Sequence, residues 1–555
     1  IMNRETESYF RELPEVHIQR SKIEKPHRLK TTWNIGDCVP IYVDEVLAGT
    51  SISMSMASVM RMATPLFPTM DNLYTDFLWF YVPYRLVWDH WANMWGENPN
   101  AWYPQIEYQV PQIKTTTNTN NQFGAKTIAD YMGLPIDTPD ISVSALPFRA
   151  YVKIWNDWFR SDPLQQEAPN VTNDTDLNAA RTGRTTYTYR GAECLKANKL
   201  HDMFTSCLPS AQRGPEITLP LGDWAPVYPR TDTVTPRTGT VSALTWDTTS
   251  TSGLTTGSHN LYTGKTTSNA PTTTYQDSAS YTASTGSLVY PNNLWTDLSN
   301  ATAATVGELR TALAVQHFYE TLARYGGGRY TEFLRAIFGV VSPDARLQRS
   351  EYLGGKRVPH NIATVVQTSS TDSTSPQGNT GAYSHTADAD DMFTKSFTEP
   401  GVVMCIMVTR YKHTYNQGIP KMFLHKKWTD FYLPQFNGIS EVPVYQKELY
   451  ATGTSTDDEV FGYQEYGYEY RYMPDMVTAE MRTTYAQSLD AWHYADHYTQ
   501  KPVLGASWIA EDKSNVDRTL VVSSGLSNQM LGDFYFNPTY VLPMPIYSIP
   551  GMDKI

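Results

Sequence analysis

Ser51-Ile-Ser-Met-Ser-Met56 and Phe77-Leu-Trp-Phe-Tyr-Val82 are the two stretches that decide the fold expected for this chain. In the first, polar and apolar residues alternate strictly, which is typical of a strand with one face in the core. The second is continuously apolar and stops at Pro83, which indicates a strand covered on both faces. Residues 402–408 form a similar apolar run much later in the chain. The sequence therefore predicts an all-β fold whose strands come from both ends of the chain.

The distance between these strands shapes the expected architecture. The chain has 555 residues, more than one ordinary core supports, so long insertions are needed. Jelly rolls carry added length in the loops between their strands. We expect an eight-stranded antiparallel jelly-roll β-barrel over 36–555, with large interstrand insertions and a few helices in the loops. Residues 1–35 are polar and partly basic and predict an extended N-terminal arm. The proline-rich stretch 538–550 predicts a tail that runs extended over a surface, often that of a neighbouring subunit.

Residues 231–304 differ in composition from the rest of the chain. Threonine and serine dominate and charges are sparse, but scattered Trp, Tyr and Leu residues argue against a simple linker. Threonine favours strands, so we expect a β-rich insertion that forms a surface protrusion and needs other copies to bury its apolar residues. The candidate tip or trimer-contact residues are Trp246, Leu254, Leu261 and Tyr262.

Four other segments have a recognisable local pattern. Thr305 and Glu308 fit a capping box, and the apolar stripe that follows ends at three glycines, which predicts a helix over 305–325. Apolar residues at helical spacing over 148–159 predict a helix that ends at Asp162-Pro163, and residues 87–95 show the same spacing. The alternating tyrosines of 466–472 predict one strand with a tyrosine face.

Composition limits the possible partners. The net charge is −12, which argues against this chain neutralising nucleic acid alone; a separate basic partner or a small positive patch would be needed. The four cysteines form no Cys-x-x-Cys pair, which indicates free thiols in a reducing compartment. Neither a membrane-length apolar segment nor an apolar signal core is present, so we expect no membrane insertion and no secretion.

Two basic clusters could contact DNA. The candidate residues are Lys22, Lys25, Arg28 and Lys30 in the first cluster, and Lys421, Lys426, Lys427 and Trp428 in the second. Cations interleaved with aromatic rings suit single strands, because every base has a face on which to stack. The alternative is that these residues form salt bridges with neighbours in an acidic assembly.

The sequence offers little support for catalysis. His493 and His497 could share a helix face as metal ligands, although Tyr494 replaces the glutamate of a zinc protease and a polar interface helix explains them as well. Asp157, between Trp155 and Trp158, would suit a sugar site, but core packing also explains the tryptophans. The acidic runs 388–391 and 457–459 lack calcium-loop spacing. Because nucleotide-binding and hydrolase motifs are also missing, we expect no catalytic residue, no metal and no cofactor.

The segment 326–379 is rich in glycine and carries forked guanidinium groups. Glycine and proline hold backbone in fixed turns, and arginine binds carboxylates and carbonyls in a planar geometry. Such residues join surfaces rather than break bonds. The candidate subunit-interface residues are Arg329, Arg335, Arg346, Arg349 and Tyr352.

Long stretches of this sequence resemble the major capsid proteins of gokushoviruses. These are a branch of the Microviridae, which are small icosahedral single-stranded DNA phages. The matching stretches include 326–379, His27-Arg-Leu-Lys30, 76–83, 457–465, Glu469-Tyr-Arg-Tyr472 and Asp490-Ala-Trp-His493. They cover most of the chain except 231–304. Ser350 and Ala336-Ile337 depart from the family pattern, which affects only local contacts.

The resemblance implies a jelly-roll subunit of a T=1 icosahedral shell around circular single-stranded DNA. It implies a threefold protrusion for host attachment, built from a variable insertion. It also implies a small basic DNA-packaging protein, a scaffolding protein, a minor pilot protein and a host receptor as partners, with assembly in the bacterial cytoplasm. The alternative is a carbohydrate-binding or carbohydrate-active β-sandwich (a lectin, adhesin or glycosidase), which as an enzyme would need two converging acids.

Overall fold

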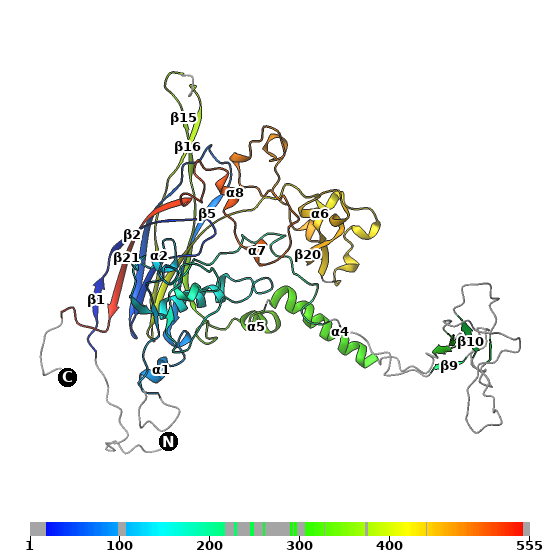
Figure 1. The fold of residues 1–555 in the computed structure, drawn as a ribbon, viewed down its shortest axis with the longest axis horizontal. Coiled ribbons are helices and arrows are strands. Elements are labelled where there is room, and N and C mark those ends of the chain that lie inside the picture. Colours follow the sequence, from blue (N-terminus) through cyan, green and yellow to red (C-terminus); the bar gives the residue numbers. More distant parts are fainter. Residues whose placement is uncertain are drawn as a thin grey trace, which may run out of the picture. The chain divides into compact units, whose positions relative to one another are not determined.

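The computed structural model describes two units of the chain (Figure 1). The larger unit comprises 1–213 and 320–555, and the smaller comprises 214–319. The described residues are 18–97, 107–215, 217, 227–229, 245–248, 259–260, 289–291, 294–296, 306–326, 328–371, 376–439 and 441–547. Residues 1–17 of the predicted arm and 548–550 of the predicted tail lie outside them.

Two antiparallel sheets form the body of the larger unit. The first sheet contains β1 (Ser21–Glu24), β2 (His27–Trp33), β21 (Met530–Leu542), β4 (Ser51–Met62) and β17 (Thr386–Ser396). The second sheet has the order β14 (Glu351–Pro359), β5 (Leu73–Pro83), β18 (Gly401–Tyr411) and β3 (Val39–Val46). The all-β class is therefore confirmed, and strands from both ends of the chain share each sheet.

The main core lies between the two sheets. On β4 the methionines Met54 and Met56 point inward while the intervening serines stay at the surface, as the alternating pattern predicts. Trp79 of β5 and Phe536 of β21 meet across this core with 6.1 Å between ring centroids. Burial of such large apolar surfaces is the main force that holds the sheets together.

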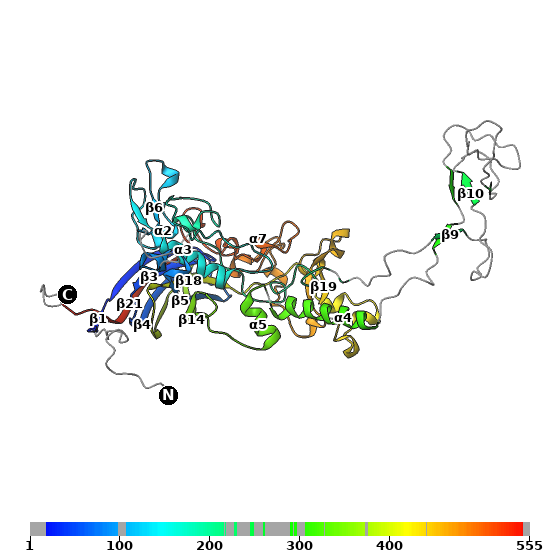
Figure 2. The ribbon, with the colours of Figure 1, turned by 90° about the horizontal axis from the view of Figure 1, so that it is seen from below.

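A second core covers the other face of the second sheet. There, α3 (Leu146–Ile154) packs against β18 and β5, so Phe80 and Val82 of β5 are buried on the face opposite Trp79 (Figure 2). This confirms that β5 and β18 are covered on both sides. The helix predicted over 148–159 is present, but its last turn is π-helical (Trp155–Phe159) and it ends at Phe159. Smaller elements around it are α1 (Trp91–Met94), α2 (Ile128–Tyr131), β6 (Gln112–Lys114), β7 (Ser142–Ser144) and β8 (Leu177–Asn178).

A third, smaller core surrounds the hairpin of β19 (Glu441–Tyr445) and β20 (Val460–Glu465). It includes residues of α6 (Gln446–Leu449) and α7 (Ala506–Ile509), and α8 (Ser514–Asp517) follows. The strand predicted over 466–472 is wrong. Gly467 takes a positive φ of 76°, and Tyr468–Tyr470 form a 3-10 turn. Tyr468 is buried and donates a hydrogen bond to Glu448, so the tyrosines do not share one face.

The two ends of the chain join the first sheet. Within the predicted arm, β1 and β2 both pair with β21, so residues 21–33 are extended but hydrogen-bonded. Within the predicted tail, residues 538–541 pair with β4 of the same chain. The four cysteines are buried and unpaired. Across the described ranges, none of the helices combines the length and apolarity needed to cross a membrane.

The smaller unit contains short antiparallel strands. β9 (Val227–Pro229) pairs with β13 (Leu294–Thr296), and β10 (Thr245–Thr248) lies between β11 (His259–Asn260) and β12 (Val289–Pro291). Trp246 belongs to β10, whereas Leu254, Leu261, Tyr262 and the capping residue Thr305 lie outside the described residues. The chain then enters α4 (Val306–Thr321), the helix predicted over 305–325, followed by a π-helical turn, Leu322–Gly326, and by α5 (Tyr330–Phe338).

Candidate functional site

The face of the first sheet that points away from the second sheet carries a row of cations. Strand register places Arg28 beside Tyr535, Lys30 beside Asp533, and Arg61 beside Leu531. Alternation sends the neighbouring Leu29 and Trp33 inward and leaves these charged side chains outside. Pairing of β2, β21 and β4 therefore gathers charges that lie more than thirty residues apart in the sequence.

Most of these cations lack a neutralising partner. The Arg28 guanidinium lies 5.6 Å from the centre of the Tyr535 ring, a cation–π geometry. In the part of the chain that the structure describes, Lys30 and Arg61 form no ion pair. Both line a shallow hollow of about 630 Å³ that also borders Asp533 and Gly532. Asp130 lines the same hollow, and Asp533 is the cross-strand neighbour of Lys30, so the two cations share this surface with two carboxylates, beside the exposed Tyr535 ring.

Small residues flatten the same face beside the cations. Ser53 and Ser55 of β4 lie there, and Ser53 Oγ is 2.9 Å from Thr394 Oγ1 of β17. Bulkier side chains of the same face, Val59, Leu531 and Tyr535, are exposed as well, so an extended polymer would meet both small and large side chains there. Cations for phosphates and a ring for bases are the groups that a single-stranded nucleic acid requires.

The structure divides the first predicted DNA cluster. Arg28 and Lys30 lie on the cationic face, whereas Lys22 pairs with Glu24 at 2.9 Å and Lys25 pairs with Asp44 at 2.9 Å. Lys25 also lies 4.3 Å from the centre of the Tyr540 ring. The sequence analysis missed Arg61 and Tyr535, because only the strand register shows that they share a face with Arg28.

The second predicted cluster is also divided. Lys421 pairs with Glu448 at 3.2 Å and lies near the Tyr445 and Tyr468 rings. Lys426 and Lys427 are exposed, and their backbone amides each donate to Asp430 at 2.8 Å, whereas their side-chain amines have no hydrogen-bond or ion-pair partner among the described residues. Trp428 beside them is 69% exposed. These three side chains remain accessible to a ligand, whereas Lys421 serves the fold.

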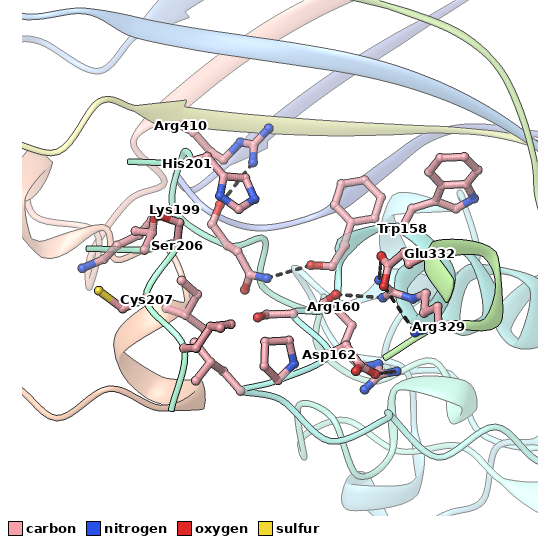
Figure 3. A pocket seen from close by; sticks show the side chains of 18 of the residues that line it. Trp158, Arg160, Asp162, Lys199, His201, Ser206, Cys207, Arg329, Glu332 and Arg410 are labelled. Carbon is pink, nitrogen blue, oxygen red and sulfur yellow. Dashed lines mark hydrogen bonds and ion pairs between the residues drawn. The ribbon is translucent and has the colours of Figure 1, made fainter. Parts of the chain in front are cut away.

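Two of the predicted interface arginines bind within the chain. Arg329 donates to the carbonyls of Asn156 and Arg160, both at 2.8 Å, and contacts Glu332 (Figure 3). Arg349 donates to the Asp157 carbonyl at 2.7 Å and lies 4.3 Å from the centre of the Trp158 ring. Arg329, just before α5, and Arg349, after α5, therefore attach both flanks of this helix to the π-helical turn that follows α3.

The other predicted interface residues are accessible. Within the described residues, Arg335 and Arg346 are exposed and have no hydrogen-bonding or ion-pair partner for their side chains. Tyr352 is 43% exposed, although its ring contacts Phe80 and Trp158. Exposed apolar residues surround the arginines: Tyr330, Phe338, Val340 and Val341. Although α5 is amphipathic, it has no fully buried residue, and Phe333, Leu334 and Ile337 on its apolar side are only partly covered in the single chain.

A pocket of about 660 Å³ lies beside this junction (Figure 3). The cations in its wall are neutralised by neighbours: Arg160 pairs with Asp162 at 3.0 Å, and Lys199 pairs with Asp496 at 3.5 Å. Asp157, the candidate for a sugar site, instead accepts hydrogen bonds from the amide and hydroxyl of Ser350, both at 2.9 Å. Trp155 is buried and donates to the Lys196 carbonyl, as the core-packing alternative predicts.

The predicted histidine pair does not form. The chain around His493 is a 3-10 turn, Asp490–Trp492, followed by extended backbone, so His493 and His497 do not share a helix face. Nearby, His413 bridges Asp496 and Glu511, with 2.9 Å at each ring nitrogen. Burial opposes its charge, but the two carboxylates raise the pKa of His413 to about 9.

The acidic runs also have structural partners. Lys356 pairs with Asp388 and Asp390, and Asp457 accepts backbone hydrogen bonds from Thr452 and Gly453. Among the residues that the structure describes, no group of three or more His, Cys, Asp or Glu side chains is arranged to hold a metal ion.

Comparison with known proteins gives matches over nearly the whole chain. The family described as "Capsid protein (F protein)" matches residues 11–552. Capsid protein VP1 of Spiroplasma virus 4 is 40% identical over 545 residues, which is 97% of this chain and 96% of that protein. Capsid protein VP1 of Bdellovibrio phage phiMH2K is 36% identical over 551 residues, covering 99% and 98%. Capsid protein VP1 of Chlamydia phage 1 is 35% identical over 594 residues, covering 98% of each.

Proposed function

This chain belongs to the phage capsid protein (F protein) family, and from that premise we propose that it assembles into a T=1 icosahedral shell around a circular single-stranded DNA genome. The family makes it a structural component of a virion. The end-to-end similarity to Microviridae-type capsid proteins carries the proposal. The two facing antiparallel sheets support a jelly roll as the building block of that shell.

Contacts between copies would cover apolar surface that a single chain leaves exposed. The exposed side of α5, with Phe338 and Val341 beside Arg335 and Arg346, has the apolar and arginine-rich character of protein interfaces. Tyr352 lies at the same junction. We assign this surface to a subunit contact. Arg329 and Arg349 support it from within, because they hold the segment against α3.

The cationic face of the first sheet is the proposed genome contact. Arg28, Lys30, Arg61 and Tyr535 would face the DNA, and the exposed Lys426–Trp428 stretch is a second candidate. These few cations cannot neutralise a genome in a chain of net charge −12. A small basic DNA-packaging protein would supply the remaining charge, and a scaffolding protein and a minor pilot protein complete the proposed partners. Assembly would take place in the cytoplasm of the bacterial host.

The insertion 231–304 is the proposed protrusion at the threefold axis. Trp246, Leu254, Leu261 and Tyr262 are the candidates for trimer contact or for the tip that meets a host receptor. The experiment deletes 231–304 and compares particles by electron microscopy and by attachment to host cells. We expect intact shells that no longer attach. A deleted chain that no longer folds, or particles that attach as well as the unaltered ones, would contradict this role.

A further inference from the structure

A two-stranded hairpin projects from the junction of the two sheets. β15 (Ile362–Val366) pairs with β16 (Thr380–Ser384) in the register Ile362↔Ser384 to Val366↔Thr380. The hairpin continues from β14 of the second sheet and leads into β17 of the first. Figure 1 shows it extending beyond both sheets, and only its base, with Ile362 against the main core and Ser384 buried, packs on the rest of the larger unit.

The hairpin is not stabilised by a third strand. In the described part of the chain, β15 and β16 pair only with each other. An isolated two-stranded hairpin is at best marginally stable in water, and its outer N–H and C=O groups form a template for another strand. The projecting hairpin therefore has unused hydrogen-bonding capacity along its edges.

Its edges lack the charges that the edge strands of the two main sheets possess. β14 carries Lys356 and Arg357, and β17 carries Asp390 and Asp391. The strands at the opposite edges, β1, β2 and β3, each contain two charged residues as well. Such charges discourage unwanted strand pairing. The segments Ile362–Val366 and Thr380–Ser384 contain no charged residue and no proline.

The hairpin also exposes apolar side chains to solvent. Val365 is 47% exposed and Tyr383 is 54% exposed, and the register places both on one face, with Val365 opposite Gly381 and Tyr383 opposite Ala363. Val366 on the other face is exposed as well. The β-branched run Thr364-Val365-Val366 favours an extended partner along β15.

We propose that the β15 edges of two copies pair antiparallel across a twofold axis, so that the two hairpins join into one sheet between subunits. A second copy suits this edge because an uncharged strip meets its identical mate without repulsion. An isologous contact also satisfies both edges at once. The inference rests on the proposed shell, which supplies the second copy.

The test introduces charges at Val365. Val365→Lys and Val365→Glu place like charges on both sides of the twofold contact, so each variant alone should give at least tenfold fewer particles in sedimentation and electron microscopy. Mixing the two variants in equal amounts places lysine opposite glutamate and should restore particles. Val521→Lys is the matched control, because Val521 is 59% exposed and lies outside the hairpin. Its particle yield should equal that of the unaltered chain.

Three outcomes would overturn the pairing. The Val365→Lys chain could form particles as well as the unaltered chain, or the mixture could remain as defective as its components, or Val521→Lys could be equally defective. The second result would mean that the hairpin contacts a different surface of its neighbour. Failure of the unaltered chain to form particles would instead contradict the proposed function. Thermal unfolding of the unassembled variants should be unchanged, since Val365 belongs to none of the three cores that the described residues form.

Discussion

His413 and Asp496 form a buried ion pair, with 2.9 Å between Nδ1 and Oδ1 and with both side chains almost completely shielded from solvent. Glu511 occupies the other side of the ring at 2.9 Å. The pair ties the segment after β18 to the loop that carries Asp496, at the boundary between the main core and the third core. Asp496 is buried, but the charges of His413 and Lys199 hold its pKa below the usual range.

This pair predicts a loss of stability at alkaline pH. The pKa of His413 is about 9 in the folded chain and 6.5 in an unfolded one. Its contribution is therefore fully present below pH 6.5 and is lost as the pH rises through 9. The free energy of unfolding of the unassembled chain should fall over this range in denaturant titrations. His413→Gln should cost about 3 kcal/mol at pH 7 and should flatten the dependence. An unchanged slope in the variant would contradict the assignment.

If the cationic face binds DNA, replacing its cations should weaken DNA binding more than replacing a cation elsewhere. Lys30→Ala and Arg61→Ala should each weaken binding to a single-stranded oligonucleotide and should lower the slope of log affinity against log salt by roughly 0.7 per lost contact. Fluorescence anisotropy at several salt concentrations measures both quantities. Lys22→Ala is the control, because its amine already pairs with Glu24. Equal effects for all three variants would indicate non-specific charge rather than this face.

Replacing Arg349 and replacing Arg346 should have different effects, because Arg349 binds within the chain and Arg346 is assigned to the contact between chains. Its guanidinium bonds to the Asp157 carbonyl and stacks on Trp158. Arg349→Ala should therefore lower the unfolding free energy of the unassembled chain by about 1–3 kcal/mol. Arg346→Ala should leave that free energy unchanged and reduce particle yield instead. The same melting temperature for Arg349→Ala and the unaltered chain would assign Arg349 to the interface.

The position of Gly418 has no space for a side chain. A Cβ atom at this position would overlap the carbonyl of Glu448, which belongs to the backbone of α6 and cannot move aside freely. Gly418→Ala should destabilise the chain by about 2 kcal/mol or more, as overpacking does. Gly438→Ala is the matched control, since nothing lies within 4 Å of its added Cβ. Similar melting temperatures for the two variants would contradict the close approach.

Short-range patterns in the sequence were sufficient for several elements. The alternation of 51–56 and the apolar run 77–82 predicted which faces of β4 and β5 are buried, because side-chain period alone decides this. Periodicity failed at 466–472, where the positive φ of Gly467 replaces the expected strand with a turn. It failed again at His493, where the backbone is not helical.

The candidate sites depended on contacts that no local pattern contains. Arg28 was a sequence candidate, but its neighbours Tyr535 and Arg61 come from distant strands and require the register of β2, β21 and β4. In the same way, the sequence indicated that Arg329 and Arg349 connect surfaces. Only the folded chain shows that the surfaces belong to one chain: both arginines bind carbonyls in the turn that follows α3. The residue types thus indicated the kind of contact each side chain can make, and the long-range strand pairing and packing determined which groups it contacts.

The mass and symmetry of the particles formed by the expressed chain test the central claim most directly. Electron microscopy with image reconstruction, combined with mass measurement, should give a closed icosahedral shell with the mass of a T=1 assembly of 62.7 kDa subunits. Shells purified with the genome should contain single-stranded DNA, with the face that carries Arg28 and Arg61 directed inward. A chain that remains a small soluble species under all assembly conditions, or shells with this face directed outward, would contradict the account.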